Sequence, residues 1–327
     1  MSNRHSSRWI IALTLSVISF AQTASVFAAE ILVADRLSNS VYRYSSSGTL
    51  LGTLLTDNTN LNQPDGLAVS PDHTKLYVAS SQNNEIVRYD YDFAAGTVSN
   101  ATVFATASNG LSFPNSMIFS DDGSTLYVAN LGGTGITQLT TSGTNAGPQI
   151  GGGSSFSFSG LSFAPGGQLL AGGFDGGTVA ISNGAISSLS DFIAPSPALT
   201  GASGVLVHGN DLYVSGLFSG LLLKFDATTG AIDPSFGVSG LAFPQGIGLN
   251  PDGSGLLVGI LGVSNGTGFI AKYGFDGTYQ GVFASPSVGG FTEATAFVTA
   301  VPEATSCILA GAGLAVVGLV VRKRQSR

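Results

Sequence analysis

Short apolar segments with a period of two recur through the middle of the chain. In one clear copy, Leu67 and Val69 alternate with the small residues Gly66 and Ala68, and PQGIGLN (244–250) repeats the pattern. A period of two is typical of β-strands, whose successive side chains point to opposite faces. Because small residues rather than charged ones fill the second face, the pattern predicts strands that are buried on both sides.

These segments belong to a repeat of 42–50 residues. The six copies are PDGLAVS (64–70), PNSMIFS (114–120), FSGLSFA (158–164), ASGVLVH (202–208), PQGIGLN (244–250) and TEATAFV (292–298). Most copies lead into a Gly/Asp turn and a second apolar strand, followed by a third strand and a weaker fourth. Four short strands per repeat of this length are typical of a β-propeller.

The two ends of the repeat region predict how the ring closes. Residues 31–55 supply a second, third and fourth strand without a first, whereas 292–298 supply a first strand alone. Joining them makes a composite blade, which removes the free edges of the ring. The sequence therefore predicts an all-β fold, a six-bladed β-propeller with helices only in its tails. A two-sheet sandwich would show one polar face on most strands, and a β-helix would need a shorter repeat.

The N-terminal segment has the pattern of a secretory signal peptide. Arg4 and Arg8 precede an apolar stretch, 9–20, and Val26-Phe27-Ala28 offers small residues for a signal peptidase that cleaves after Ala28. An uncleaved membrane anchor is the alternative. We expect a signal peptide at 1–28 and export of the remainder.

The C-terminal segment combines a short polar motif, an apolar run and a basic end. The motif VPEAT (301–305) is followed by the apolar run 308–321 and then by the basic residues Arg322, Lys323 and Arg324. A helix of this length spans about two thirds of a bilayer core of roughly 30 Å. The basic residues should stay on the cytoplasmic side during export and stop transfer. A buried C-terminal helix of the domain is the alternative, although such helices normally keep a polar face.

This arrangement resembles the PEP-CTERM sorting signal of exported bacterial proteins. Val301, Pro302 and Glu303 match the motif, and Ala304 stands where a second Pro is usual. The resemblance implies processing by an exosortase-like enzyme and delivery to the outer surface or the extracellular matrix. The expected domains are thus 1–28 (signal peptide), 29–300 (propeller) and 301–327 (sorting signal).

Removing the two tails changes the composition of what remains. The only Trp, Trp9, and the only Cys, Cys307, lie in the tails, so the domain has no disulfide in spite of export. Between 29 and 300, 6 basic residues face 18 acidic ones, for a net charge of −12. This balance argues against nucleic acid and anionic membrane surfaces as partners of the domain. It is compatible with cations, neutral glycans and small neutral ligands.

The repeats resemble those of NHL and SMP-30/gluconolactonase-like propellers. ADRLSNSVYRY (34–44) is similar to an NHL unit, and 64–80 and 114–130 are similar to SMP-30 units. These families include both binding proteins and enzymes, so the resemblance supports the fold more than a function.

A polar residue occupies the second position of every copy of the repeat. The six are Asp65, Asn115, Ser159, Ser203, Gln245 and Glu293. Each begins an innermost strand, so we expect them to ring one mouth of the central channel. In SMP-30-like enzymes a Glu, an Asn and an Asp hold a divalent cation at this level. Asp65, Asn115 and Glu293 match these residue types, and such oxygen ligands suit Ca²⁺ or Mg²⁺.

Two observations weaken the comparison with a metal enzyme. The family carries its ligands in a different order around the ring, and the predicted ring here offers no His or other base to activate water. The alternative is that the six residues only satisfy backbone groups where the strands begin. Five aspartates lie in tight turns and are expected to stabilise those turns: Asp72, Asp121, Asp122, Asp252 and Asp276.

Two classes of function therefore stay open. The first is an exported, non-enzymatic propeller, with no catalytic residue, that binds extracellular polysaccharide or surface proteins. The second is an SMP-30-like, divalent-metal-dependent hydrolase of lactones or esters. The sorting signal favours the first, because proteins with such signals are commonly linked to the extracellular matrix.

Overall fold

A computed structural model describes residues 30–133, 135–261, 268–284 and 294–300. These residues belong to one compact unit, Ala28–Glu303. The signal peptide, the sorting motif (Val301, Pro302, Glu303), the apolar run and the basic end lie outside the described residues, as does Glu293.

The described residues form antiparallel sheets with almost no helix. The first sheet has the order β22-β1-β2-β3, with β22 (Ala294–Ala300), β1 (Glu30–Asp35), β2 (Ser40–Ser45) and β3 (Leu50–Thr56). The second comprises β4 (Pro64–Val69), β5 (Lys75–Ser80), β6 (Glu85–Asp92) and β7 (Thr97–Ala105). The third comprises β8 (Pro114–Phe119), β9 (Thr125–Asn130) and β10 (Ile136–Thr140).

The other three sheets follow in chain order. They comprise β11 (Phe158–Phe163), β12 (Leu169–Gly173), β13 (Thr178–Ser182) and β14 (Leu189–Ile193); β15 (Ala202–His208), β16 (Asp211–Gly216) and β17 (Leu221–Asp226); and β18 (Pro244–Leu249), β19 (Leu256–Ile260), β20 (Phe269–Tyr273) and β21 (Tyr279–Ala284). Helical structure in the described ranges is limited to the 3₁₀ turns η1 (Ser81–Asn83), η2 (Ala107–Asn109) and η3 (Pro197–Leu199). In this part of the chain no helix is long and apolar enough to cross a membrane.

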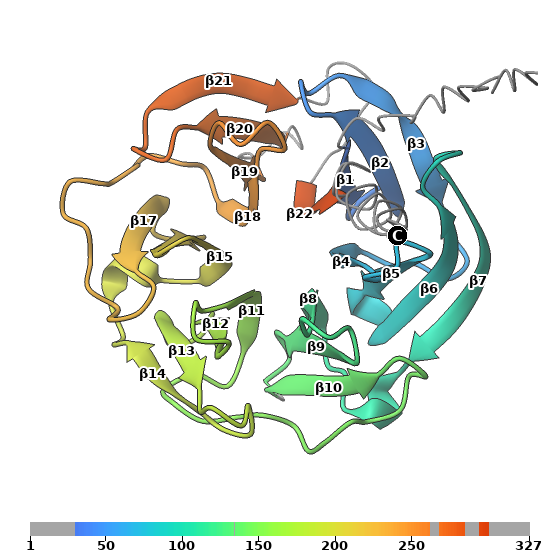
Figure 1. The fold of residues 1–327 in the computed structure, drawn as a ribbon, viewed down its shortest axis with the longest axis horizontal. Helices are drawn as coiled ribbons and strands as arrows, with labels where there is room; N and C mark the ends of the chain where they lie inside the picture. The colour runs from blue at the N-terminus through green and yellow to red at the C-terminus, as the bar shows by residue number, and fades with distance from the viewer. Residues whose placement is uncertain (1–29, 134, 262–267, 285–293, 301–327) are drawn as a thin grey trace, which may run out of the picture. The chain divides into compact units, whose positions relative to one another are not determined.

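The innermost strands lie side by side around a common axis. β4 contacts β8, followed in turn by β11, β15, β18 and β22, and β22 contacts β4 again. Figure 1 shows the sheets radiating outward from this circle of strands. The predicted all-β propeller architecture is confirmed.

The first sheet is built from both ends of the domain. β22 pairs with β1 in antiparallel register, Ile31 opposite Thr299 and Val33 opposite Phe297. Both edges of β1 are thereby occupied, because β2 pairs along its other side. β22 runs two residues past the predicted end at Val298, since Ala300 pairs with Glu30 at the start of β1.

The third and fifth sheets have three strands, where four were predicted. Their outer positions hold only isolated bridges, such as Ile136–Ile150 in the third sheet and Leu222–Val238 in the fifth. The segments involved contain Pro148 and Pro234, which lack the N–H that a strand ladder needs, and several glycines. The outermost segments therefore cover the edges of these sheets without forming regular strands.

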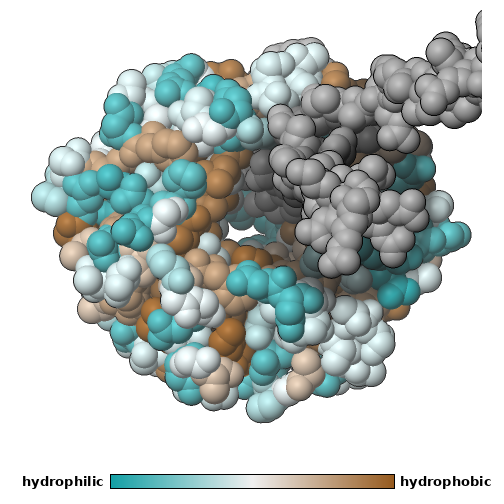
Figure 2. Space-filling model, in the orientation of Figure 1, coloured by the Kyte–Doolittle hydropathy of each residue, from teal (hydrophilic) through white to brown (hydrophobic). Residues whose placement is uncertain are grey.

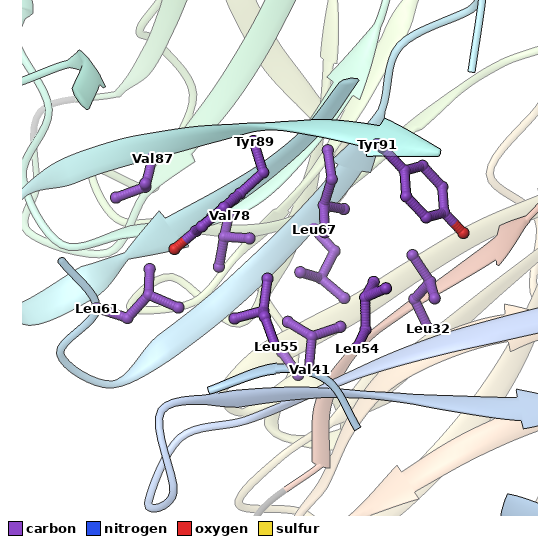
Figure 3. Packing of buried hydrophobic residues seen from close by; sticks show 12 residues of the cluster. Leu32, Val41, Leu54, Leu55, Leu61, Leu67, Val78, Val87, Tyr89 and Tyr91 are labelled. Atoms are coloured by element: carbon purple, nitrogen blue, oxygen red, sulfur yellow. The ribbon is translucent and has the colours of Figure 1, made fainter. Parts of the chain in front are cut away.

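Both faces of the sheets are buried, as the alternation of large and small residues predicts. Leu67 packs with Leu32, Val78 and other residues between the first and second sheets (Figure 3). Its neighbour Ala68 packs on the opposite face with Met117, between the second and third sheets. Small residues at these alternate positions let adjacent blades approach.

Gly66 and Gly204 show why no side chain fits at some of these positions. A Cβ at Gly66 would lie less than 3.0 Å from the Asn115 carbonyl oxygen of the next inner strand, and one at Gly204 would meet the Gln245 carbonyl in the same way. Backbone atoms cannot move aside as side chains can, so glycine sets the spacing of the inner strands.

Candidate functional site

The predicted ring residues lie at one end of a central cavity. Asn115, Ser159, Ser203 and Gln245 line a cavity of about 440 Å³ enclosed by the inner strands. Each is the second residue of its strand, so the repeat places all four at the same depth. We call the side of the molecule where the inner strands begin the mouth face.

Three of these residues form a hydrogen-bonded chain. Ser159 Oγ donates to Asn115 Oδ1 at 2.7 Å, and Ser159 Oγ lies 3.3 Å from Ser203 Oγ. A hydroxyl has one proton to donate, so Ser203 is the donor in the second bond. These hydrogen bonds link three consecutive blades and orient the hydroxyl groups at the cavity wall.

The rest of the cavity wall is mostly apolar. Ser116 and Ser162 also line it, and the inner strands contribute large apolar side chains: Leu67, Val69, Met117, Ile118, Phe119, Leu161, Val205, Leu206, Ile247 and Leu249. Among the described residues that line the cavity, none is titratable. In Figure 2, hydrophobic residues border much of the central opening on the face in view. The described wall therefore suits an uncharged ligand with an apolar surface and a few hydroxyl groups.

Asp65 is buried beside the cavity and pairs with an arginine. Its side chain is 1% exposed, and its Oδ1 lies 3.1 Å from Nε of Arg36. Arg36 also donates from Nη2 to Oε1 of Gln63 at 2.8 Å, and its guanidinium carbon lies 6.0 Å from the centre of the Phe113 ring. The contacts of the guanidinium with other described residues thus include a carboxylate, an amide and an aromatic ring.

The backbone at the strand entries is strained in a recurring way. Gln63, Phe113 and Phe243 each precede the proline that begins an inner strand, and their φ angles are +54°, +52° and +56°. Residues with side chains rarely adopt this left-handed conformation, which the surroundings must hold in place. Their carbonyl oxygens accept N–H groups of the same blade, for example from Leu131 to Phe113 at 3.0 Å.

Exposed apolar side chains lie on the mouth face. We call Leu37, Phe156, Phe218 and Phe243 the apolar collar; they are 57%, 73%, 58% and 40% exposed. Each lies in a loop that enters an inner strand or joins the second and third strands of a sheet. In an antiparallel blade both loop types lie on the same side, here the mouth face. Apolar groups gathered on one face often mark a binding site.

Asp175 holds the loop that presents Phe156. Its carboxylate accepts hydrogen bonds from the hydroxyl of Ser155 and from the backbone N–H of Phe156, the latter at 3.2 Å. Burial raises the pKa of Asp175, but these hydrogen bonds outweigh it and leave the pKa below its usual value. Phe156 is therefore exposed on an anchored loop.

The cation site predicted from the sequence is only partly described. Asp65 and Asn115 lie near one another at the mouth, whereas Glu293 lies outside the described residues. Within the described ranges, no three His, Cys, Asp or Glu side chains lie close enough to share a metal ion. The predicted set includes an asparagine and Glu293, so this finding does not test it.

Sequence reasoning missed Arg36 and the apolar collar. The position of Arg36 in a loop sets it apart from the other basic residues of the domain. Those five lie within strands: β2, β5, β6, β17 and β20. A lone basic residue in a mouth-face loop could have been identified as a partner for the ring. The collar has no periodic pattern, so its side chains could be placed on one face only with the blades assembled.

Comparison with protein families finds one similarity. The model of the SMP-30/gluconolactonase/LRE-like region matches residues 27–148. The match covers Arg36, Asp65 and Asn115 but less than half of the chain. No curated protein sequence matches the chain.

Solved structures share the fold at low sequence identity. A putative 6-phosphogluconolactonase from Bacteroides fragilis is 16% identical, with a TM-score of 0.57 over 84% of this chain and 98% of that one. The periplasmic gluconolactonase of Pseudomonas aeruginosa is 16% identical, with a TM-score of 0.55 over 84% and 100%. A chain of a nidogen–laminin complex is 12% identical, with a TM-score of 0.63 over 82% and 97%. At these identities the likeness shows the fold alone.

Proposed function

We propose that this chain is an exported, non-enzymatic β-propeller of the cell surface or extracellular matrix, and that its mouth face binds an uncharged glycan. The observation that carries the proposal is the chemistry of the central cavity. Hydroxyl and amide groups of Asn115, Ser159, Ser203 and Gln245 lie beside a mostly apolar wall, and the described lining has no titratable side chain. Such a wall can form hydrogen bonds with a ligand but offers no acid, base or nucleophile of shifted pKa.

The apolar collar supports a sugar chain as the ligand. Phe156, Phe218 and Phe243 expose flat aromatic rings on the mouth face. The C–H faces of sugar rings pack on such surfaces, while their hydroxyl groups pair with serine and amide side chains. The strongly acidic domain repels polyanions, so a neutral chain fits better than an anionic one.

Export and ring closure complete the proposal. In this proposal the six sheets are the six blades of the propeller, and the first blade is composite. The two terminal segments direct the export and sorting of the protein. A signal peptidase removes 1–28, and an exosortase-like enzyme acts at Val301, Pro302 and Glu303 while the tail is in the membrane. Partners are then extracellular polysaccharides or surface proteins.

A binding assay with aromatic variants tests the proposal. The mature domain is sedimented with insoluble neutral polysaccharides such as cellulose and curdlan, and with the host's own matrix polysaccharide. We expect the wild type to co-sediment and Phe156→Ala with Phe218→Ala to bind about thirtyfold more weakly, because each of the two rings contributes on the order of 1 kcal/mol. Tyr279→Ala is the matched control, since Tyr279 is 55% exposed on the outer strand β21. Equal binding by the double variant would contradict the glycan site.

The second candidate is an SMP-30-like lactone or ester hydrolase with a divalent cation on Asp65, Asn115 and Glu293. The observation that favours it is the family match over 27–148. Hydrolysis of glucono-δ-lactone, followed by acid release with Ca²⁺, Mg²⁺ or Mn²⁺ and with EDTA, tests it. Metal-dependent turnover that Asp65→Asn abolishes would favour the hydrolase, and turnover at the background rate would reject it.

A further inference from the structure

The channel mouth carries a buried carboxylate that already has a cation beside it. Asp65 is 1% exposed and Arg36 is 19% exposed, and the two side chains meet at 3.1 Å. Burying an ionised carboxylate costs several kcal/mol unless a positive group compensates its charge. Arg36 supplies that charge from within the chain, across the boundary between the first two blades.

Several contacts hold the guanidinium in its position. Nη2 of Arg36 donates to Gln63, and the planar group lies near the ring of Phe113. The loop itself is fixed by Asp35, which accepts the N–H of Leu37 at 3.3 Å and the hydroxyl of Ser38 at 2.6 Å. A planar, rigid donor group held in this way keeps its partners without rearrangement.

The described part of the predicted ligand set does not fit a divalent cation in this arrangement. Ca²⁺ needs its oxygen ligands at about 2.3–2.6 Å. Oδ1 of Asp65 faces the guanidinium, and Oδ1 of Asn115 accepts the hydroxyl of Ser159 at 2.7 Å. A divalent ion on these oxygens would also lie close to the positive charge of Arg36, which repels it. Metal binding would thus require the ion pair to break.

We infer that Arg36 is a built-in counter-ion, which takes the place of a divalent cation beside Asp65 and makes the channel mouth independent of metal. This chain then shares its blade pattern with the family that matches 27–148. In this chain, however, a guanidinium balances the negative charge of the buried carboxylate at the mouth. The inference holds whichever ligand the mouth binds. A failure of glycan binding therefore leaves it standing, and its own failure leaves glycan binding standing.

Thermal unfolding with and without cations tests the inference. The wild type is melted in EDTA and in millimolar Ca²⁺, Mg²⁺ or Mn²⁺, and we expect the same Tm in all four. Arg36→Ala removes the positive charge beside a buried carboxylate, so in EDTA its Tm should fall by roughly 5–9 °C. Millimolar Ca²⁺ should restore much of this loss, because the ion can now take the vacated position. The control, Arg36→Ala with Asp65→Asn, should not respond to Ca²⁺.

Two outcomes would overturn the inference. One is a wild-type Tm that rises with Ca²⁺ when Asp65→Asn does not respond. The other is a folded Arg36→Ala variant whose Tm is the same with and without each of the three cations. Should Arg36→Ala fail to fold, Mn²⁺ binding to the wild type, measured by the loss of its free electron paramagnetic resonance signal, decides the question. The inference expects the same signal for wild type and Asp65→Asn, and binding that Asp65→Asn removes would refute it.

Discussion

Aspartate side chains close the hairpin turns of the blades. In the turn between β8 and β9, Asp122 accepts the hydroxyl of Ser120 at 2.6 Å and the N–H of Ser124 at 3.0 Å. Asp72 makes the equivalent contacts with Ser70 and Thr74 between β4 and β5. The predicted role of these residues in stabilising turns is confirmed. The hydrogen bonds from Ser120 and Ser124 lower the pKa of Asp122 to about 2.

These depressed pKa values predict a loss of stability in acid. A carboxylate whose pKa is lower in the folded chain stabilises the fold above its unfolded pKa of about 3.9. That contribution is lost as the pH falls from this value towards the folded pKa, about 2 for Asp122. We expect Tm to be flat down to about pH 5 and to fall below about pH 4. Asp122→Asn, which keeps an acceptor but no titrating group, should show a smaller fall between pH 4 and 2. An equal fall in both proteins would contradict this account of the turn.

Glycine at the third position of the inner strands sets the contact between neighbouring elements. Gly66 in β4 faces the backbone of β8, and Gly204 in β15 faces that of β18. In both cases the neighbouring atom is a carbonyl oxygen within the circle of inner strands. A substitution that displaces one inner strand should therefore also change the width of the channel.

Gly66→Ala tests this contact. Its new methyl group would overlap the Asn115 carbonyl, and overpacking of this kind costs about 1–3 kcal/mol. We expect a lower midpoint of urea unfolding and an unchanged slope. Gly184→Ala is the matched control, because a Cβ at Gly184 meets nothing within 4 Å. A Gly66→Ala variant as stable as that control would show that the inner strands are not tightly spaced.

The elements that the sequence predicts well are those with buried faces on both sides. Leu67 and Ala68 alternate because each packs into a different interface, and that constraint is visible in a single strand. The outermost segments of the third and fifth sheets, which form no regular strand, carry weak patterns, since they contact the sheet on one side only. Near Pro148 only isolated bridges, Leu139–Asn145 and Ile136–Ile150, join the outer segment to β10.

The candidate site was predictable only where it follows the repeat. Asn115, Ser159, Ser203 and Gln245 share one position in successive copies, so their convergence on the cavity follows from the fold. The ion pair between Arg36 and Asp65 joins two blades through loops of different kinds. No local pattern encodes such a contact, because it depends on where the assembled blades place each loop.

At the scale of the whole molecule, the two ends of the domain meet in one sheet. β22 and β1 pair along their length, so the folded ring is complete at Ala300. The sorting motif Val301-Pro302-Glu303 follows directly in sequence. The proposed sorting signal thus begins in sequence directly after the last residue of β22.

Removal of 301–327 tests the separation of fold and address. We expect the truncated protein to keep the Tm of the full domain, because β22 and its pairing with β1 are retained. Fractionation of cells should find it in the medium instead of at the surface. A control that replaces Arg322, Lys323 and Arg324 by Gln should weaken retention in the membrane with the motif intact. Loss of folding on truncation would mean that the tail belongs to the core.

The central claim is that the cavity at the mouth binds an uncharged glycan without metal. The most direct test is isothermal titration of the mature domain with neutral hexasaccharides of the cello-, laminari-, malto- and xylo- series, in EDTA and in Ca²⁺. We expect one series to bind with the same Kd in both buffers. Asn115→Ala with Ser159→Ala should weaken that binding about thirtyfold, since it removes two groups whose hydrogen bonds are worth on the order of 1 kcal/mol each. Binding that disappears in EDTA, or that the double variant leaves unchanged, would contradict the claim.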